Sequence, residues 1–530
     1  MAVRLSDNPA PQDVPLDDSS GSFHSILFQR PEEREAETTE EPQFFRDLNL
    51  DQVVEAITAG RERYNLKPFY YMPLNNRAAI EYRHEIMRDL EDDQLFQAVS
   101  SFSAGMRTMY DQLATAEKSY SKYEMLYWHV DAVEIYCKAA ETLLQYLCRD
   151  KARSTGLLGF RDYLAQYVAS SDFTALLAEG QKLKADLSAI RYCVLISGSR
   201  VTVRKCKSEI DYTAVIEETF SKFKRETVTD YRVKFSTLVG LNHVEVMILE
   251  RVAQLYPDVF QRLEEYCSRT RSYVDHTIAD FDREVQFYLA YLEHVGMFKR
   301  SGLQFCYPEV SESSKSIRSR DSFDLALAGK LLEEGSHIIC NDCVLDGNER
   351  TLVVTGPNQG GKTTFARAFG QLHYLAGLGC PVAGTEAKLF LFDRIFSHFE
   401  REEDISNLRG KQQDDLVRIN RILDQITSNS IIIINEIFAS TTVRDALFLS
   451  RKILDRISQC DLLCLCVTFL DELSCLNEKA ASFVAGVAPD DPTVRTYKIE
   501  KRAADGRAYA LAIADKYRLT YSHVKERVGA

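Results

Sequence analysis

The chain has 530 residues, of which 45% are hydrophobic and 27% charged, and its formal net charge is −13. These proportions are typical of a globular protein with more than one domain, and no apolar run is long enough to cross a bilayer. The N-terminus also lacks a basic segment followed by an apolar one, the pattern of a signal peptide. We therefore expect a cytoplasmic protein without a membrane partner.

Residues 1–43 are predicted to form a disordered acidic tail. The segment carries ten acidic residues against three arginines, which is −7 of the total charge, and it holds five prolines. A segment of this composition buries too little apolar surface to offset the entropy of folding. The rest of the chain is only mildly acidic, so its charge neither requires nor excludes a nucleic-acid partner.

Residues 44–320 are predicted to form an α-helical core and lever domain. Apolar residues recur there at helical spacing, and glycine and proline are sparse. The amphipathic stretches cover residues 51–64, 76–90, 95–117, 120–149, 160–187, 244–263 and 267–295. The last two are long enough to act as a connecting arm.

The helical pattern stops near residues 190–207, where two β-branched runs flank a Ser-Gly-Ser turn. This pattern predicts a β-hairpin. Its basic side chains are candidates for contacts to a DNA backbone, and the alternative is a solvated hairpin face. The candidates are Arg200, Arg204, Lys205 and Lys207.

Cys340 and Cys343 have the spacing of half a zinc site or of a redox pair. A structural zinc site needs a second such pair or histidines at ligand distance, and neither follows. We therefore expect no structural zinc.

Residues 321–530 are predicted to form an α/β domain with a mainly parallel sheet, because strand and helix patterns alternate there. The apolar run 351–355 precedes a glycine loop, and a helical pattern follows the loop. A nucleotide-phosphate loop requires this order. We expect Lys362 to reach the β- and γ-phosphates of ATP and Thr363 to bind Mg²⁺. The predicted phosphate-binding residues are Gly356, Pro357, Asn358, Gln359, Gly360, Gly361, Lys362, Thr363 and Thr364.

A second apolar run, residues 430–437, supplies the polar groups that such a loop needs beside it. The run ends in Asn435 and Glu436, at the carboxyl end of a predicted buried strand, where α/β folds bind ligands. We expect Glu436 to orient or deprotonate the attacking water. Asn435 takes the place of a carboxylate and is expected to hold Mg²⁺ through a water molecule.

These motifs resemble the MutS family of DNA mismatch-repair ATPases. The phosphate loop 356–364 has the family's Gly-Pro-Asn-x-Gly-Gly-Lys sequence, and residues 337–345 resemble the family's strand that ends in Asn-Asp. The loop after Glu436, with Thr441, Thr442 and Asp445, matches the family, and residues 506–527 resemble its closing helix-turn-helix. The similarity is strong over residues 336–530 and weaker but collinear over residues 45–320.

The resemblance implies a helical core, lever and clamp domain followed by a P-loop ATPase domain of the ABC type with C-terminal dimerisation helices. It implies ATP and Mg²⁺ as ligands, DNA as a partner and a homodimer in which each chain completes the other's nucleotide site. Arg409, Lys411 and Asp445 are the candidate residues at that shared site. The implied function is a nucleotide-gated DNA clamp in mismatch repair or DNA structure processing.

Several positions depart from the family pattern. The region 407–416 is charged and lacks the family's Ser-Thr pair, Phe469 stands where a histidine is expected, and Asn435 replaces an acidic residue. We therefore expect ATP binding with slow hydrolysis. Only the acidic tail precedes residue 45, so we expect no dedicated module for reading mismatches.

A second interpretation is a nucleotide-gated scaffold that binds proteins through its arms and has no DNA role. The same departures from the family pattern and the negative net charge favour this interpretation. A third interpretation, an ATPase of the SMC or transporter type, lacks support because the sequence has no long heptad repeat, membrane span or Leu-Ser-Gly-Gly signature.

Overall fold

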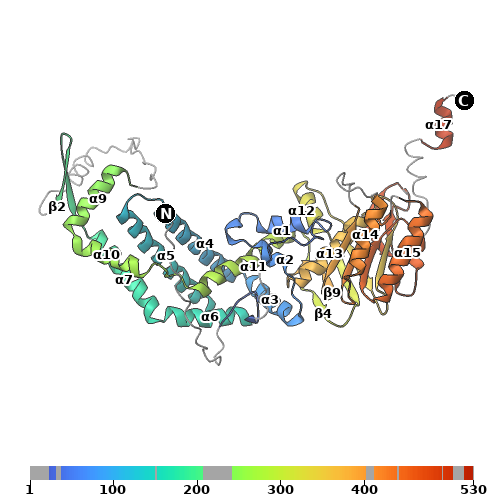
Figure 1. The fold of residues 1–530 in the computed structure, drawn as a ribbon, viewed down its shortest axis with the longest axis horizontal. Helices are drawn as coiled ribbons and strands as arrows, with labels where there is room; N and C mark the ends of the chain where they lie inside the picture. Colours follow the sequence, from blue (N-terminus) through green and yellow to red (C-terminus); the bar gives the residue numbers. More distant parts are fainter. Residues whose placement is uncertain are drawn as a thin grey trace, which may run out of the picture.

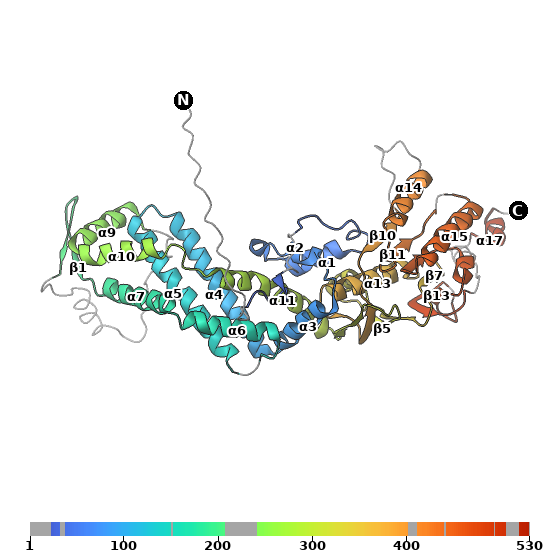
Figure 2. The same cartoon turned by 60° about the horizontal axis from the view of Figure 1, so that its bottom comes forward.

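The computed structural model describes residues 23–31, 38–149, 152–206, 241–400, 411–438, 441–491, 493–504 and 519–528. The molecule is elongated, with a helical arm at one end and an α/β domain at the other (Figure 1). Helix α11 runs between the two along the long axis (Figure 2). Within the described ranges, none of the helices combines the length and hydropathy that a bilayer span requires.

The helical half contains one β-hairpin at the far end of the arm. Its elements are α1 (Leu50–Thr58), η2 (Glu62–Tyr64), α2 (Lys67–Tyr71), α3 (Arg77–Leu90), α4 (Asp93–Glu117), α5 (Lys122–Leu147), α6 (Thr155–Val168), α7 (Ser171–Ser188), β1 (Tyr192–Ser197), β2 (Arg200–Lys205), α9 (His243–Leu255), α10 (Pro257–Arg269) and α11 (His276–Arg300).

Local sequence signals set the ends of these helices. The Asp92 side chain accepts hydrogen bonds from the first amides of α4, and Asn242 forms a capping box with Glu245 at the start of α9. Two predicted stretches are shorter or divided. The stretch 51–64 ends as a helix at Thr58, because Gly60 follows with a left-handed φ of 75°. The stretch 160–187 divides where Ser170 caps the start of α7.

The α/β half consists of a six-stranded sheet with its helices and a smaller four-stranded sheet. Its elements are β3 (Phe305–Cys306), β4 (Glu309–Ser311), β5 (Ile317–Ser322), α12 (Leu325–Glu333), β6 (Asn341–Leu345), β7 (Thr351–Thr355), α13 (Lys362–Gly377), β8 (Val382–Ala383), β9 (Glu386–Phe390), β10 (Ile395–Phe399), α14 (Lys411–Leu423), β11 (Ile431–Asn435), α15 (Val443–Gln459), β12 (Leu463–Val467), η3 (Asp471–Cys475), β13 (Ala480–Val487), β14 (Arg495–Lys501) and α17 (Tyr521–Val528).

The six-stranded sheet has the order β10-β11-β12-β7-β13-β14. All neighbours are parallel except the edge pair β13–β14, so the predicted, mainly parallel sheet forms. The smaller sheet has the order β4-β9-β5-β6. Strands β4 and β5 pair with β9, so the α/β half begins before the predicted boundary at residue 321.

Two hydrophobic cores lie on opposite faces of the large sheet. In β11, Ile431 and Ile433 join a core that continues through α13 into the arm, whereas Ile432 and Ile434 join a smaller core under α14 and α15. Alternate side chains of a strand point to opposite faces, so one strand serves both cores. The phosphate-loop helix therefore shares a core with the arm, and α14 and α15 do not.

The predicted disordered tail is wrong for part of its length. Residues 25–28 are buried against the arm, with Ile26 and Leu27 fully enclosed. The Ser25 hydroxyl donates to Glu284 of α11 at 2.8 Å, and the Ile26 N–H donates to the same carboxylate at 3.1 Å. An average over the whole segment conceals this short apolar run. Residues 1–22 and 32–37 lie outside the described part of the chain.

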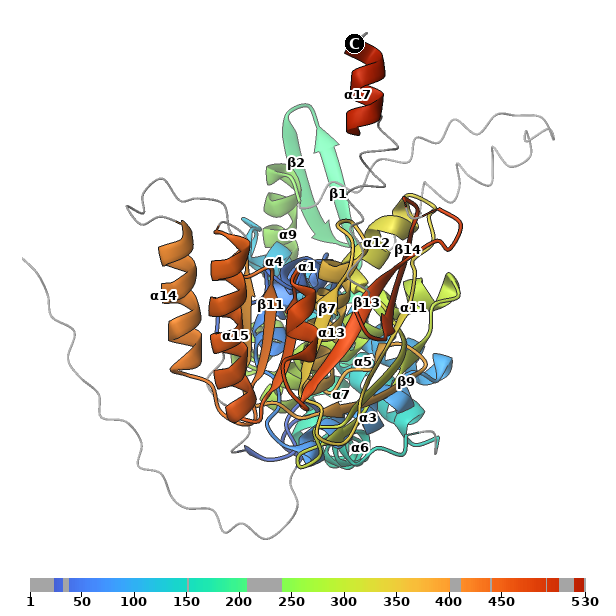
Figure 3. The same ribbon diagram turned by 90° about the vertical axis from the view of Figure 1, so that its right-hand side faces the viewer.

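Of the predicted C-terminal helix-turn-helix, the described part contains only α17. This helix stands apart from the sheet, and none of its residues is buried (Figure 3). Residues 505–518, which include most of the resemblance to the family's closing motif, lie outside the described part.

Three cations surround one carboxylate at the turn between α15 and β12. Asp461 accepts a hydrogen bond from Lys479 at 2.8 Å, and Lys315 and Arg350 each lie 3.3 Å from it. Partial burial alone would raise the pKa of Asp461, but the three cations outweigh it and lower the pKa from 3.8 to about 2.

We predict that Asp461→Asn lowers the free energy of unfolding at neutral pH. Because the folded-state pKa is depressed, the carboxylate's contribution is present above pH 3.8 and is lost as the pH falls toward about 2. Urea denaturation of both proteins at several pH values should show their difference shrinking below about pH 4. Asp424→Asn is the control, since that residue pairs only weakly with Arg456 at the surface. A difference that does not depend on pH would contradict this account.

Candidate nucleotide-binding site

The phosphate loop lies between β7 and α13, at the carboxyl edge of the parallel strands. Gly356 has a φ of 114°, and a Cβ there would lie 3.0 Å from the Ala485 backbone nitrogen on β13. Gly361, with a φ of 90°, forms the N-cap of α13. Both positions need glycine, because L residues with side chains rarely adopt this conformation. The loop thus directs the N-terminal amides of a sixteen-residue helix toward its concave side.

Lys362, the first residue of α13, is 5% exposed and folds back into the loop. Its ammonium donates to the Gly356 carbonyl at 2.9 Å and to the Pro357 carbonyl at 3.1 Å. Burial lowers the pKa of Lys362, and the Glu436 carboxylate opposes part of that shift. A positive charge is therefore held where phosphate oxygens enter a loop of this type.

The end of β11 meets the loop directly. The Thr363 hydroxyl donates to the Asn435 side-chain oxygen at 3.0 Å. Next to it, Glu436 has a left-handed φ of 55°, and its N–H donates to the Val467 carbonyl of β12 at 2.9 Å. Strained non-glycine backbone of this kind is concentrated at functional sites. The structure thus brings together the two motifs that the sequence placed about seventy residues apart.

Lys362, Thr363 and Glu436 line one cavity of about 540 Å³. Its walls include Asn358 to Thr364 and Glu436, together with apolar residues of α12 and of the segment before β6. The apolar residues are Leu327, Leu331, Ile338 and Ile339.

Tyr497 is a wall residue that the sequence patterns do not reveal. It belongs to β14, is 50% exposed and has a left-handed φ of 57°. Asn341 fixes its backbone, because the Asn341 side chain donates to the Tyr497 carbonyl at 3.1 Å and accepts from the Ile499 N–H at 2.7 Å. The pairing of β14 with β13, together with the hydrogen bonds from Asn341 of β6, brings this aromatic ring beside Gly361, so no local pattern identifies it.

Other predicted site residues lie elsewhere. Asp445 is not in the cavity wall. Its carboxylate accepts a hydrogen bond from the Thr442 hydroxyl at 2.8 Å in the first turn of α15. Arg409 lies outside the described residues, and Lys411 begins α14 with a side chain that is not described. Phe469, at the position expected to be histidine, is 43% exposed just after β12.

The predicted DNA-contact residues lie on the hairpin, at the opposite end of the molecule from the nucleotide cavity (Figure 1). Strands β1 and β2 pair from Tyr192↔Lys205 to Ser197↔Arg200. Arg200, Arg204 and Lys205 are exposed, and the Lys205 ammonium lies 4.7 Å from the Tyr256 ring centre. Lys207 lies outside the described residues. The two sites can therefore affect each other only through the arm.

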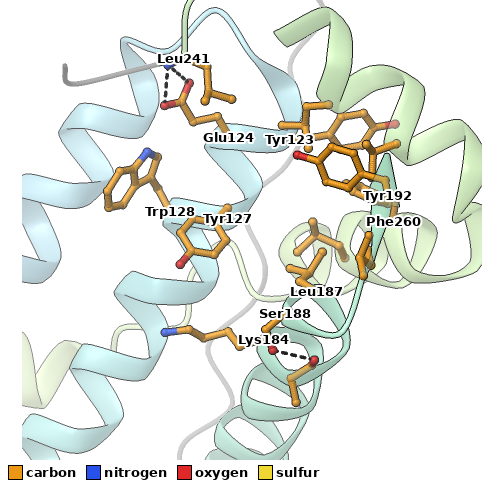
Figure 4. Close-up of a pocket in the computed structure, with 15 residues that line it drawn as sticks. Tyr123, Glu124, Tyr127, Trp128, Lys184, Leu187, Ser188, Tyr192, Leu241 and Phe260 are labelled. Carbon is orange, nitrogen blue, oxygen red and sulfur yellow. Dashed lines mark hydrogen bonds between the residues drawn. The ribbon is translucent and has the colours of Figure 1, made fainter. Parts of the chain in front are cut away.

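A second cavity, of about 740 Å³, lies at the base of the hairpin. Figure 4 shows aromatic side chains of α5, α10 and β1 around it, among them Tyr127, Tyr192 and Phe260. Glu124 at its rim accepts a hydrogen bond from the Leu241 N–H at 3.2 Å. The cavity is apolar and lies far from the phosphate loop, so it belongs to a different site.

Among the described residues, no group of three or more His, Cys, Asp or Glu side chains is placed to hold a metal ion. Cys343 is buried in β6, and Cys340 is partly buried just before that strand.

Known proteins resemble this chain in the regions just described. The family model for MutS domain V matches residues 352–527. The DNA mismatch repair protein MutS of Bacillus cereus strain B4264 is 24% identical over 378 residues, covering 67% of this chain and 39% of that protein. The MutS protein of Bacillus cytotoxicus is 25% identical over 291 residues, covering 52% of this chain and 30% of that protein. The chain thus spans about two fifths of the length of the first of these relatives. The chain is thus similar to MutS domain V over residues 352–527 and, at about a quarter identity, to whole MutS proteins over a longer stretch.

Proposed function

We propose that the protein is a dimeric, nucleotide-gated DNA clamp that binds ATP with Mg²⁺ and hydrolyses it slowly. The observation that carries the proposal is that Lys362, Thr363 and Glu436 line one cavity and that Asn435 is hydrogen-bonded to Thr363 at its wall. The relatives in the comparison are named as DNA mismatch repair proteins, which favours a role in mismatch repair or DNA structure processing.

The cavity suits a nucleoside triphosphate. The Lys362 ammonium is held by two loop carbonyls, and phosphate oxygens are stronger acceptors that would take their place. The amides at the start of α13 add further donors and the positive end of the helix dipole. Tyr497, Ile338 and Ile339 supply aromatic and apolar surface for the base.

The polar groups beside the loop suit Mg²⁺. The Thr363 hydroxyl and the Asn435 amide oxygen are 3.0 Å apart, and both are oxygen donors of the kind that this ion prefers. We expect Thr363 to bind the ion directly and Asn435 to bind it through water; bound there, Mg²⁺ would offset the negative charge of the phosphates. Glu436 would orient the attacking water and accept its proton. Because Asn435 carries no charge, we expect the ion to be held weakly and turnover to be slow.

A second copy of the chain would cover the open side of this cavity. Exposed apolar residues lie at the same carboxyl edge of the sheet as the phosphate loop, because they follow the parallel strands β11 and β12. They are Val443 at 62% exposure, Phe448 at 61% and Phe469 at 43%. Apolar surface of this kind favours a protein interface. Arg409, Lys411 and Asp445 remain our candidates for contacts across it.

ATP would gate the clamp by changing how the two chains pair. Contacts from both chains to the γ-phosphate favour a closed dimer, and hydrolysis removes them. The arms would then change their separation, and the hairpin cations at their ends would contact the DNA backbone. Arg200, Arg204 and Lys205 are the described cations in that position.

One observation favours the alternative, a nucleotide-gated scaffold without a DNA role. The large cavity at the base of the hairpin is apolar and aromatic, which is typical of a surface that binds protein rather than a phosphate backbone (Figure 4). DNA binding by the purified chain distinguishes the two functions.

We predict that Asn435→Asp tightens Mg²⁺ binding, because the substitution places a carboxylate 3.0 Å from the Thr363 hydroxyl without changing the side chain's shape. The Mg²⁺ concentration required for half-maximal nucleotide hydrolysis should fall by roughly tenfold, the effect of about 1.4 kcal/mol. Asn429→Asp, at an exposed position just before the other end of β11, is the matched control. An unchanged Mg²⁺ requirement would show that Asn435 is not beside the ion.

We predict that Lys362→Ala abolishes ATP binding, whereas Glu436→Ala keeps binding and accumulates the ATP-bound dimer. The first change removes the charge inside the loop, and the second removes the group that activates water. Equilibrium binding of a fluorescent ATP analogue, together with light scattering for the dimer, measures both effects. If both variants bind and hydrolyse ATP as the wild type does, the assignment of the site is wrong.

We predict that DNA affinity falls steeply with salt and that Arg204→Ala with Lys205→Ala makes this dependence shallower. Each phosphate contact that is lost should reduce the slope of log K against log salt by about 0.9. Lys138→Ala with Lys182→Ala removes two exposed lysines elsewhere on the arm and is the matched control. No DNA binding at low salt with saturating ATP would favour the scaffold.

A further inference from the structure

We propose that Arg83 is a positioning residue that couples the phosphate-loop helix α13 to the root of the arm. By the root of the arm we mean residues 44–90 together with α11. The proposal rests on the proposed function, because it concerns how bound nucleotide reaches the arm. Arg83 lies in the middle of α3 and is 1% exposed, the largest of the fully buried side chains in the described ranges. A buried guanidinium costs several kcal/mol unless its donors are satisfied, so its partners define its role.

These partners belong to three different parts of the chain. Arg83 Nε donates to the Leu27 carbonyl at 3.0 Å, and one terminal nitrogen donates to the Leu378 carbonyl at 2.9 Å. The guanidinium also lies 5.1 Å from the ring centre of Phe287 in α11. The guanidinium of one residue in α3 therefore contacts α11, the N-terminal segment 25–28 and the end of α13.

Leu378 is the C-cap of α13, and Lys362 of the phosphate loop is that helix's first residue. The carbonyls at a helix C-terminus carry partial negative charge, so a cation stabilises them. A helix of sixteen residues is about 24 Å long and stiff. Arg83 thus holds the end of α13 opposite to the one that would bind phosphate.

The fit between α3 and the chain after α13 is close. Gly379 has a φ of 73°, and a Cβ at this position would lie 2.9 Å from the Arg83 Cβ and 3.1 Å from its Cδ. The backbone conformation and the space both require glycine here. We call Arg83 with Gly379 the Arg83 joint.

Residues 25–28 fix the other side of the joint. The Leu27 carbonyl that Arg83 binds is held in place because its neighbours are bonded to α3 and α11. The Tyr82 hydroxyl donates to the Ser25 carbonyl at 2.6 Å, and the Tyr288 hydroxyl donates to the Ile26 carbonyl. Arg83 is therefore clamped between two fixed carbonyls and has little freedom to shift.

The rest of α13 is also bonded to the root of the arm, so the helix and the root form one body. The bonds are Arg367 Nε to the Asp47 carbonyl (3.0 Å), the Gln371 side chain to the Leu48 carbonyl (2.8 Å), the Tyr374 hydroxyl to the Tyr70 carbonyl (2.9 Å) and the Leu74 N–H to the Gly377 carbonyl (2.7 Å). Local opening of α3 must break the bond from Arg83 to the end of α13, and local opening of α11 must break its contact with Arg83. Nucleotide that stabilises α13 at its other end therefore makes this opening rarer.

The test is hydrogen exchange of backbone amides in the full chain, with and without saturating Mg²⁺ and a non-hydrolysable ATP analogue. In the wild type, the analogue should slow exchange in α3 and α11 by about fivefold or more, besides protecting the phosphate loop. In Arg83→Met, the phosphate loop should still be protected, but the slowing in α3 and α11 should be lost. A merely structural role for Arg83 would speed exchange with and without nucleotide and leave the difference between them intact.

Arg88→Met is the matched control, because Arg88 lies on the same helix but stacks on Tyr307. It should behave as the wild type does. Gly379→Ala keeps the arginine but places a Cβ against its side chain. It should therefore abolish the slowing in α3 and α11 even if Arg83→Met does not fold. Two results would overturn the coupling but not the proposed ATP site. In the first, both joint variants still show the slowing in α3 and α11. In the second, the wild type shows a protected phosphate loop without that slowing. A wild type whose phosphate loop is not protected would overturn the proposed ATP site as well.

Discussion

Helix α13 packs against both the parallel sheet and the root of the arm, and the arrangement of the two halves of the molecule depends on these contacts. One end opens from the phosphate loop, and its body lies against the parallel sheet, where Gly370 leaves no room for a Cβ between Leu48 and Ile433. Its other side is bonded along its length to the root of the arm, and its last carbonyls face Arg83. The helix is thus buried from both sides, and neither half of the molecule can move against it without exposing apolar surface or breaking buried hydrogen bonds.

The two cores join different helices to the two faces of the large sheet. The side chains of Ile431 and Ile433 in β11 face the core that is shared with the arm, and those of Ile432 and Ile434 face α14 and α15. The larger core extends from the segment 25–28 to α13, whereas none of the residues in the smaller core belongs to the described part of the arm. The arm is therefore packed against one face of the sheet only.

The site combines features that favour binding with a feature that does not favour fast chemistry. The loop, its buried lysine and the Thr363–Asn435 bond are preorganised for phosphate and a divalent cation. Asn435, however, offers an oxygen without a charge. A clamp that has to persist on its partner benefits from a long-lived nucleotide state, so retention with slow turnover agrees with gating.

Sequence reasoning succeeded where chemistry is encoded within a few neighbouring residues. The spacing of Gly356, Gly361 and Lys362 predicts a glycine loop between a strand and a helix, and the run before Asn435 predicts a buried strand. Both are present, because sterics and hydrogen bonding of adjacent residues decide them. The order of strands and helices likewise fixed a mainly parallel α/β layer. Averages over long windows failed for the opposite reason: the acidic composition of residues 1–43 concealed four residues that the arm buries.

The tertiary structure alone decided the contacts between distant segments. Tyr497 reaches the phosphate loop because β14 pairs with β13 and is tied to Asn341, and no local pattern records that approach. No local pattern shows that Arg83 is buried, yet it lies between two carbonyls that are about 350 residues apart in the sequence. The sequence by itself determined that a glycine loop joins a buried strand to a helix beginning at Lys362, and that a second buried strand ends at Asn435. Which residues surround that loop, and how the loop is joined to the arm, follow from long-range packing, because burial and charge pairing depend on neighbours that only the folded chain brings together.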